Sequence, residues 1–336
     1  MEPIPIVRAA HLIPYLHLLR GIGAPVETAL CRGKLPTMLV DQSDAQVPLL
    51  QSIDFLINMA LSEGIDDLAL RTRERSNIKN LHPVFLSSIC SAPTLKTALE
   101  TVFRLVTLEN NYLDLWMVFD ASEARICSRY RIPFDAQQTR LVELDINVVL
   151  VGIVRAFTGP RWCPEEMAFR STLPLGRYVS EQFPNTRILL GQKTAWFGLP
   201  RAMLSLPPRI KSKTGSSPST LTPAIEMGRD FPATLKQILQ SYLADGYPTI
   251  QLAAEIAGTS PRTLQRRLRE YNLNYSKLVH QAQFESAVEL LTDPANQMLD
   301  IAYAVGYEDP SNFARAFRSI AGVNPREYRR QHLITE

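Results

Sequence analysis

The chain contains the stretch Ala257-Gly-Thr-Ser-Pro-Arg-Thr-Leu-Gln-Arg-Arg-Leu268, and its pattern returns as Gly306-Tyr-Glu-Asp-Pro-Ser-Asn-Phe-Ala-Arg-Ala-Phe-Arg318. Between residues 250 and 318 the matching positions lie 49 apart, as Pro261 and Pro310 do. The other pairs are Ala253 with Ala302, Arg266 with Arg315, Arg269 with Arg318, and Leu252, Ile256, Leu264 and Leu268 with Ile301, Val305, Phe313 and Phe317. Each copy predicts a helix, a tight turn and a second helix that begins at proline.

The first copy has the features of a helix-turn-helix unit. Gly258 tolerates the turn, Ser260 offers a capping hydroxyl, and Pro261 occupies the first helical position, where its missing N–H costs nothing. Leu264 and Leu268 are four residues apart and therefore point inward. The opposite face carries a row of polar side chains, namely Arg262, Gln265, Arg266 and Arg269. Arginine can bind guanine, and glutamine adenine, through two hydrogen bonds, so this row suits a major groove.

The second copy predicts the same arrangement, with Asp309 as the helix cap and Pro310 as the first helical residue. Its outward positions are Ser311, Asn312, Arg315 and Arg318. Gly306 stands opposite Ala257 rather than Gly258, so the two turns need not share one backbone path. Between the copies, residues 275–291 predict one helix of roughly 25 Å. The second helix of each copy is called a reading helix, because its polar face suits a major groove. The helix at 275–291 could hold the two reading helices about one duplex turn apart, near the ~34 Å that successive major grooves require.

A single copy of this pattern is more often an ordinary solvated helix with arginines on its exposed face. Two copies in register, with matching caps and matching arginines, instead favour a protein that binds double-stranded DNA.

These stretches, with Gly322-Val-Asn-Pro-Arg-Glu-Tyr-Arg329, closely resemble the DNA-binding domain of AraC/XylS-type transcription regulators over the last 105 residues or so. The resemblance implies that Arg262, Gln265 and Arg266 contact bases from the first reading helix, and Ser311, Asn312 and Arg315 from the second. Two positions depart from the family pattern. Gln283 stands where arginine is common and Asn272 where glycine is common, which puts one supporting contact in doubt and leaves the groove-facing positions intact.

Composition limits the remaining choices. A chain of 336 residues can form two domains, and 46% hydrophobic with 21% charged residues is an ordinary soluble composition. The net charge of +3 is too small to attract nucleic acid by itself, and residues 230–336 are slightly acidic in total. The attractive field must come from two local groups of arginines: Arg262, Arg266, Arg267 and Arg269, and Arg326, Arg329 and Arg330.

The first part of the chain, residues 1–206, predicts an α+β effector-binding and dimerisation domain. Helical periodicity covers 6–20, 48–61, 94–107 and 137–157, and strands are predicted at 113–119, 124–130, 167–171 and 194–199. A Pro-, Ser- and Thr-rich linker follows at 207–223, and an all-α domain with both helix-turn-helix motifs occupies 224–336.

The stretches Ser91-Ala-Pro-Thr-Leu-Lys-Thr-Ala-Leu99 and Gly191-Gln-Lys-Thr-Ala-Trp-Phe197 resemble the "arabinose-binding" type of N-terminal domain found in some members of this family. Sugar binding is not implied. Trp116, Trp162, Trp196, Tyr112 and Tyr130 could line a pocket but are more typical of a core, and Arg104, Arg129 and Arg155 are more typical of a surface than of an anion site. Effector-binding residues therefore stay unassigned.

No pattern of catalytic residues and no metal-ligand spacing stands out, so we expect neither an enzyme nor a cofactor or metal. Cys31, Cys90, Cys127 and Cys163 are far apart and are expected to be buried, small apolar side chains. No apolar run approaches the ~20 residues of a membrane span, and the N-terminus lacks the features of a signal peptide, so a cytoplasmic protein is expected.

The leading hypothesis is a sequence-specific transcription regulator, an activator, in which a small-molecule effector changes dimer geometry or releases the DNA-binding domain. Its expected partners are double-stranded promoter DNA, a second copy of the chain, and RNA polymerase. An alternative keeps DNA binding but gives the first domain only a dimerising role. A remote alternative is an Ada-type DNA-repair methyltransferase, which would need clustered cysteines near the N-terminus, where Cys31 stands alone.

Overall fold

The computed structural model describes residues 2–76, 81–209, 228 and 230–333, and its contacts divide the chain into two compact units. The first, here called the helical unit, comprises Met1–Ala9, Leu30–Gln51 and Gly228–Glu336. The second, the mixed unit, comprises Ala10–Ala29 and Ser52–Met227. The units therefore do not follow chain order, since residues 1–9 and 30–51 pack with the carboxyl-terminal helices. Of the predicted linker, residues 210–223 lie outside the described part of the chain.

The mixed unit is built around a five-stranded sheet. Its strands are β3 (Leu113–Phe119), β4 (Glu123–Tyr130), β5 (Glu166–Ala168), β6 (Arg187–Leu189) and β7 (Ala195–Pro200). They lie in the order β3-β4-β7-β5-β6, and all neighbours are antiparallel except the parallel pair β5 and β6. The helices that precede these strands or lie between them in the sequence are α1 (Ile13–Gly21), α2 (Val26–Arg32), α3 (Leu49–Ser62), α4 (Leu68–Ser76), α5 (Pro83–Ser91), α6 (Leu95–Leu105), α7 (Ala136–Thr158) and α8 (Arg177–Gln182).

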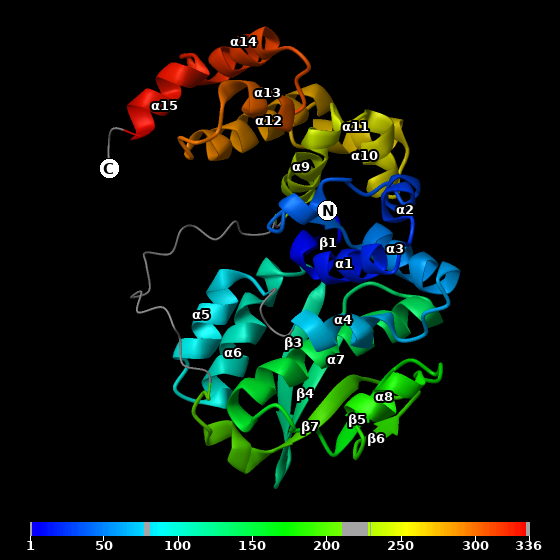
Figure 1. The fold of residues 1–336 in the computed structure, drawn as a ribbon. Helices are drawn as coiled ribbons and strands as arrows, with labels where there is room; N and C mark the ends of the chain where they lie inside the picture. The colour runs from blue at the N-terminus through cyan, green and yellow to red at the C-terminus, as the bar shows by residue number, and fades with distance from the viewer. Residues whose placement is uncertain (1, 77–80, 210–227, 229, 334–336) are drawn as a thin grey trace. The chain divides into compact units, whose positions relative to one another are not determined.

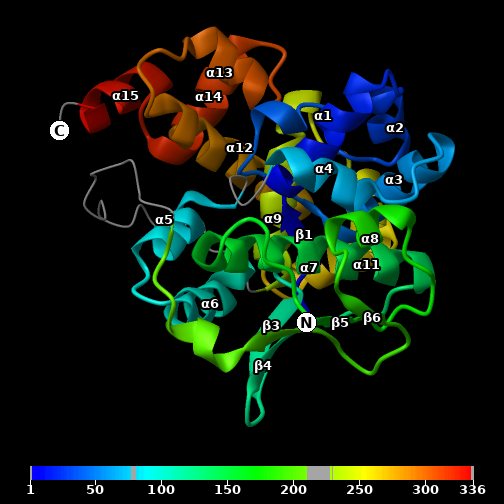
Figure 2. The same ribbon diagram turned by 60° about the horizontal axis from the view of Figure 1, so that its bottom comes forward.

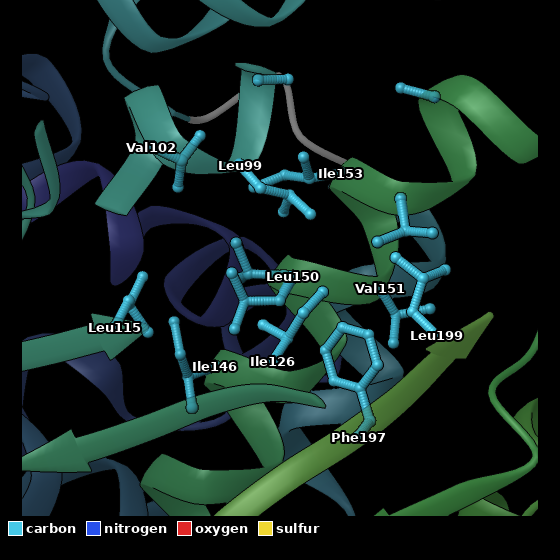
Figure 3. Close-up of a cluster of buried hydrophobic side chains, with 14 of the residues drawn as sticks. Leu99, Val102, Leu115, Ile126, Ile146, Leu150, Val151, Ile153, Phe197 and Leu199 are labelled. Carbon is cyan, nitrogen blue, oxygen red and sulfur yellow. The ribbon is translucent and has the colours of Figure 1, made fainter. Parts of the chain in front are cut away.

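The core of the mixed unit lies between one face of this sheet and the helices α6 and α7. Figure 3 shows Leu150 and Val151 of α7 near the strand side chains Ile126 and Leu199, and Ile153 of α7 near Leu99 of α6. Figure 2 shows α6 beside β3, with α5 on the outer side of α6. Helix α7 begins sharply because the Asp135 carboxylate accepts hydrogen bonds from the first free backbone N–H groups of the helix.

The predicted α+β fold class is confirmed, and most predicted elements agree with the structure within two residues. The predicted helix over 6–20 is wrong at its start, because Ile6–Arg8 forms β1, which pairs with β2 (Gln46–Pro48), and α1 begins only at Ile13. The strand predicted over 167–171 ends at Ala168. The cause is a carboxylate: the N–H groups of Arg170 and Ser171 donate to Glu143 at 2.8 and 3.2 Å instead of to a neighbouring strand.

The helical unit carries the predicted all-α region. Its helices are α9 (Phe231–Tyr242), α10 (Ile250–Ile256), α11 (Pro261–Arg269), α12 (Tyr275–Leu291), α13 (Met298–Ala304), α14 (Pro310–Ala321) and α15 (Pro325–Leu333). Figure 1 shows the pairs α10–α11 and α13–α14 as two groups joined through α12. Aromatic and aliphatic side chains of α12, α13 and α14 form one core, with Phe313 and Phe317 at 4% and 2% exposure.

Candidate DNA-binding surface

The first helix-turn-helix forms as the sequence predicts. Helix α10 ends at Ile256 and is followed by Gly258, whose φ of +59° is a left-handed conformation that glycine adopts without strain. The Ser260 hydroxyl then accepts a hydrogen bond from the Thr263 N–H at 3.2 Å and caps α11. Leu264 and Leu268 are fully buried, so the opposite face of α11 is turned to solvent.

The second helix-turn-helix uses the same devices. Gly306 has a φ of +81° after α13, and the Asp309 carboxylate accepts a hydrogen bond from the Ser311 N–H at 2.8 Å to cap α14. Phe313 and Phe317 take the buried positions of Leu264 and Leu268. The two helix-turn-helix motifs are therefore built alike from the cap of the second helix onward.

The repeat has two registers rather than one. The first helix of each motif ends with an equivalent backbone hydrogen bond. The Thr259 N–H donates to the Ala254 carbonyl at 2.8 Å, and the Tyr307 N–H donates to the Ala302 carbonyl at 2.9 Å. The two first helices therefore repeat at a spacing one residue shorter than the 49-residue spacing of the reading helices. In the structure Ala302 matches Ala254, whereas the sequence repeat paired it with Ala253. The additional residue lies between Gly306 and the cap at Asp309, which lengthens the second turn.

All eight side chains predicted to contact DNA are exposed: Arg262, Gln265, Arg266 and Arg269 on α11, and Ser311, Asn312, Arg315 and Arg318 on α14. Within the described residues, none of their arginines forms an ion pair with a carboxylate of the chain. The Arg315 guanidinium donates a hydrogen bond to the Asn312 side-chain oxygen. Two of the four predicted side chains on α14 are thus coupled to each other, whereas no hydrogen bond joins those on α11 within the described part of the chain.

The basic groups are smaller than the sequence suggests. The Arg267 guanidinium lies over the Phe231 ring at 5.5 Å, away from the row on α11. Arg329 donates to the Leu291 and Asn296 carbonyls at 3.2 and 2.8 Å, and so holds the end of α12 in place. Arg330 pairs with Glu327 at 3.2 Å. Of the two groups, Arg262, Arg266 and Arg269 on α11 and Arg326 on α15 are therefore left exposed and without an ion pair among the described residues.

Gln283, which stands where arginine is common in the family, is buried and makes two hydrogen bonds of its own. Its side chain is 3% exposed and donates to the Val305 carbonyl at 2.9 Å, and the Tyr307 hydroxyl donates to its oxygen at 3.1 Å. Both polar atoms are satisfied, as a buried amide requires. Gln283 thus ties α12 to the turn of the second helix-turn-helix.

Asn272 occupies a backbone conformation that explains why glycine is suited to its position. Its φ is +56°, in the left-handed region that asparagine tolerates better than other side chains. We expect Asn272→Val to lower the free energy of unfolding of the helical unit by about 1–2 kcal/mol, because a β-branched residue is strained there. Asn272→Gly is the matched control and should change it by less than about 0.5 kcal/mol. Hydrogen–deuterium exchange of α11 and α12 measures both; equal protection in the two variants would contradict the argument.

The prediction that all four cysteines are buried is wrong for three of them. Cys127 is buried, and burial raises the pKa of its thiol to about 11, but Cys31 is exposed, and Cys90 and Cys163 are half-buried. Among the described residues, no group of three or more His, Cys, Asp or Glu side chains could hold a metal ion. No helix in that same part of the chain is long and apolar enough to cross a membrane.

The aromatic and basic residues weighed as pocket candidates have separate roles. Trp162 packs on Phe197 with ring centroids 6.3 Å apart, and the Arg155 guanidinium donates to the Trp162 carbonyl at 2.8 Å. Tyr112 is buried, and Trp116 and Trp196 lie beneath Arg129 and Arg125. Tyr130 and Arg129 line a hollow of about 490 Å³ at the ends of β4 and β7.

A pair of capped helix-turn-helix motifs, each with an exposed polar face, defines a DNA-binding regulator. Comparison with protein families agrees: residues 253–331 match a helix-turn-helix domain, and residues 23–208 match the N-terminal arabinose-binding domain of AraC transcription regulators. The second match covers more than half of the 336 residues, so the chain belongs to the AraC-type transcription regulators. It is a DNA-binding regulator and not an enzyme, and the Ada-type alternative is set aside.

Relatives match along the full length. The chain is 24% identical over 336 residues to the HTH-type transcriptional regulator VirS of Mycobacterium tuberculosis, with 98% of each chain covered. It is 21% identical over 334 residues to the ornithine utilization regulator of Pseudomonas aeruginosa, covering 98% of this chain and 96% of that protein. The crystal structure of the regulator CdpR from Pseudomonas aeruginosa is 17% identical, covers 91% of this chain and 96% of that chain, and has a TM-score of 0.41.

Proposed function

We propose that the regulator places α11 and α14 in two successive major grooves on one side of its operator. The observation that carries this proposal is the pair of exposed polar rows on two reading helices of one unit, joined through α12. Helix α12 has 17 residues, or roughly 25 Å, which suits a separation near one duplex turn.

Within this proposal the eight residues have two kinds of role. On α11, Arg262, Gln265 and Arg266 contact base edges, and Arg269 contacts phosphate. The corresponding residues on α14 are Ser311, Asn312 and Arg315 for bases and Arg318 for phosphate. The hydrogen bond from Arg315 to Asn312 supports a joint role for that pair, because it brings the two side chains together on the exposed face of α14.

Selection of bound duplexes from a random-sequence pool by the full-length chain tests the proposal. We expect an enriched sequence with two conserved blocks whose centres lie about 10 base pairs apart. Affinity should fall steeply as salt rises, since contacted phosphates release counterions. A pool without enrichment, or a single block with no second one a turn away, would contradict the proposed docking.

The remaining assignments concern regulation. We assign residues 1–206 to effector binding and dimerisation, 207–223 to the linker and 224–336 to DNA binding, with activation through RNA polymerase as the output. The alternative, a first domain that only dimerises, predicts no stabilisation by any metabolite. A ligand at 100 times its dissociation constant should stabilise the protein by about 2.7 kcal/mol, so thermal-shift screening separates the two. Sedimentation of the free protein tests the dimer.

Contacts within the helical unit support a physical link between effector and operator. Residues 30–51 belong to the segment that matches the arabinose-binding domain, yet they pack on the DNA-binding helices. The Tyr242 hydroxyl donates to the Lys34 carbonyl at 2.7 Å, and the Thr37 N–H and hydroxyl both donate to the Asp245 carboxylate, the former at 2.9 Å. Lys34 also forms an ion pair with Glu255 of α10.

Removing the contacts of Thr37 should change DNA binding without altering any residue of the reading helices. Asp245→Ala deletes the acceptor of two hydrogen bonds, each worth about 0.5–1.5 kcal/mol. If release of the segment frees the DNA-binding helices, operator affinity without effector should rise by about fivefold, a coupling of about 1 kcal/mol. Glu289→Ala, which removes an exposed carboxylate of α12, is the control for the change in charge. Fluorescence anisotropy measures both; an equal shift in the two variants would attribute the effect to charge alone.

A further inference from the structure

The hollow at the ends of β4 and β7 is lined by four cations, and the interactions of the described residues set only two carboxylates against them, Asp114 and the buried Glu143. It has a volume of about 490 Å³ and is lined by four cationic side chains, Arg129, Arg131, Arg170 and Lys193. Asp114 pairs with Arg129 and Arg131 at 3.3 and 3.4 Å, so a single carboxylate is shared by two arginines. No ion pair of the described residues involves the side chains of Arg170 or Lys193.

These cations are held on a backbone that cannot easily separate them. The Arg170 N–H donates to the buried Glu143 carboxylate at 2.8 Å, which fixes the bend after β5. The loop that carries Lys193 is joined to the same bend, because the Gly191 and Gln192 N–H groups donate to the Ser171 and Phe169 carbonyls at 3.0 and 2.9 Å. The backbone positions of Arg170 and Lys193 are therefore fixed relative to each other, and their exposed side chains are free to turn toward a bound anion.

Donors outnumber acceptors among the side chains of the lining. The arginine and lysine side chains donate hydrogen bonds and accept none, whereas the hydroxyls of Ser128, Tyr130 and Thr194 can do either. A ligand that fits must be rich in acceptors. This argues for an oxyanion rather than for a neutral sugar, whose hydroxyls also need acceptors.

We propose that this hollow binds a small anion with two or more negative charges, such as a di- or tricarboxylate or a phosphate ester, and that this anion is the effector of the regulator. The effector role rests on the proposed function, whereas binding of the anion does not. Among the described residues Arg170 and Lys193 form no ion pair, although the Glu143 carboxylate attracts the charge of Arg170, and Arg129 and Arg131 complete the site. This gives a chemical class to the effector that the sequence leaves open.

Two side chains allow a clean test. Arg170→Gln and Lys193→Gln remove charge but leave the folding contacts of their loops, which are made by backbone groups. Arg104→Gln, at an exposed arginine of α6 outside the hollow, is the matched control. Titration calorimetry of the full-length chain with citrate and with pyrophosphate, at constant ionic strength set by sodium chloride, reports binding directly.

We expect saturable binding of at least one probe, one per chain, weakened about tenfold for each cation removed and unchanged in Arg104→Gln. Binding of citrate alone or pyrophosphate alone supports the proposal and identifies the source of the anion. Absence of saturable binding by both probes, equal weakening in the control, or displacement of the probe by a short random duplex would overturn it.

Measurements of operator binding distinguish a failure of this inference from a failure of the proposed function. The double variant Arg170→Gln, Lys193→Gln should select the same operator as the unaltered chain, and its affinity for that operator should no longer respond to the bound probe. If the unaltered chain binds the probe without any change in operator affinity, the effector role is overturned while DNA binding stands. If no operator is selected by either protein, the proposed function fails, and calorimetry still decides whether the hollow is an anion site.

Discussion

Replacing Phe317 by alanine should lower the free energy of unfolding of the second helix-turn-helix by about 3–5 kcal/mol. The side chain is 2% exposed and is surrounded by aromatic rings, with centroids of Phe284, Tyr328 and Phe313 at 4.9, 5.3 and 5.9 Å. These rings come from α12, α14 and α15, so the cavity would lie where three helices meet. We expect α14 to lose protection from hydrogen–deuterium exchange and operator affinity to fall with it.

The same helix supplies the control for this prediction. Ile320 is also a large apolar residue of α14, but its side chain is 49% exposed, so Ile320→Ala should change stability by less than about 0.5 kcal/mol. Protection of α11 should survive in both variants, because Leu264 and Leu268 are buried apart from this core. Comparable losses from Phe317→Ala and Ile320→Ala would show that α14 is not held by the cluster around Phe317.

The reading helices could be predicted from sequence because their signals are local. A cap at Ser260 or Asp309, a proline after it and two apolar residues four apart are enough to set both the start of a helix and its buried face. The eight exposed side chains follow from that face alone. Their exposure was therefore predictable, while their contacts with DNA remain a proposal.

The start of the chain could not be predicted in the same way. Residues 6–20 have helical periodicity, yet Ile6–Arg8 forms a strand because β2, some 40 residues later, offers it a partner. Pairing between distant segments leaves no local trace in the periodicity of either one. The early end of β5 has a similar cause, since the acceptor for Arg170 is Glu143 on α7.

The basic hollow illustrates the same limit for sites. Arg129, Arg131, Arg170 and Lys193 come from three separate parts of the chain, and each alone has the features of a solvated surface residue. Only the order of the strands, in which β7 lies between β4 and β5, brings them together. The reverse holds for Arg267 and Arg329, which the sequence counts among the DNA-facing charges and the structure assigns to packing and helix capping.

Arg266→Ala should cost about 1–3 kcal/mol at the selected operator and relax base preference at one position of the first conserved block. Arg266 lies in the middle of the exposed row on α11, and within the described residues no carboxylate competes for its guanidinium. Removing a bidentate contact with guanine costs affinity only where that base is present. Binding to scrambled duplex should therefore weaken much less than binding to the operator.

Arg269→Ala is the matched comparison, because it removes the same charge one turn further along α11. If Arg269 contacts phosphate, its loss should weaken operator and scrambled duplex by similar factors and reduce the salt dependence of binding by about one counterion. Anisotropy titrations of both variants on both duplexes, at two salt concentrations, separate the two roles. Equal losses on operator and scrambled duplex for Arg266→Ala would mean that Arg266 contacts the backbone, and base recognition by α11 would then rest on Arg262 and Gln265.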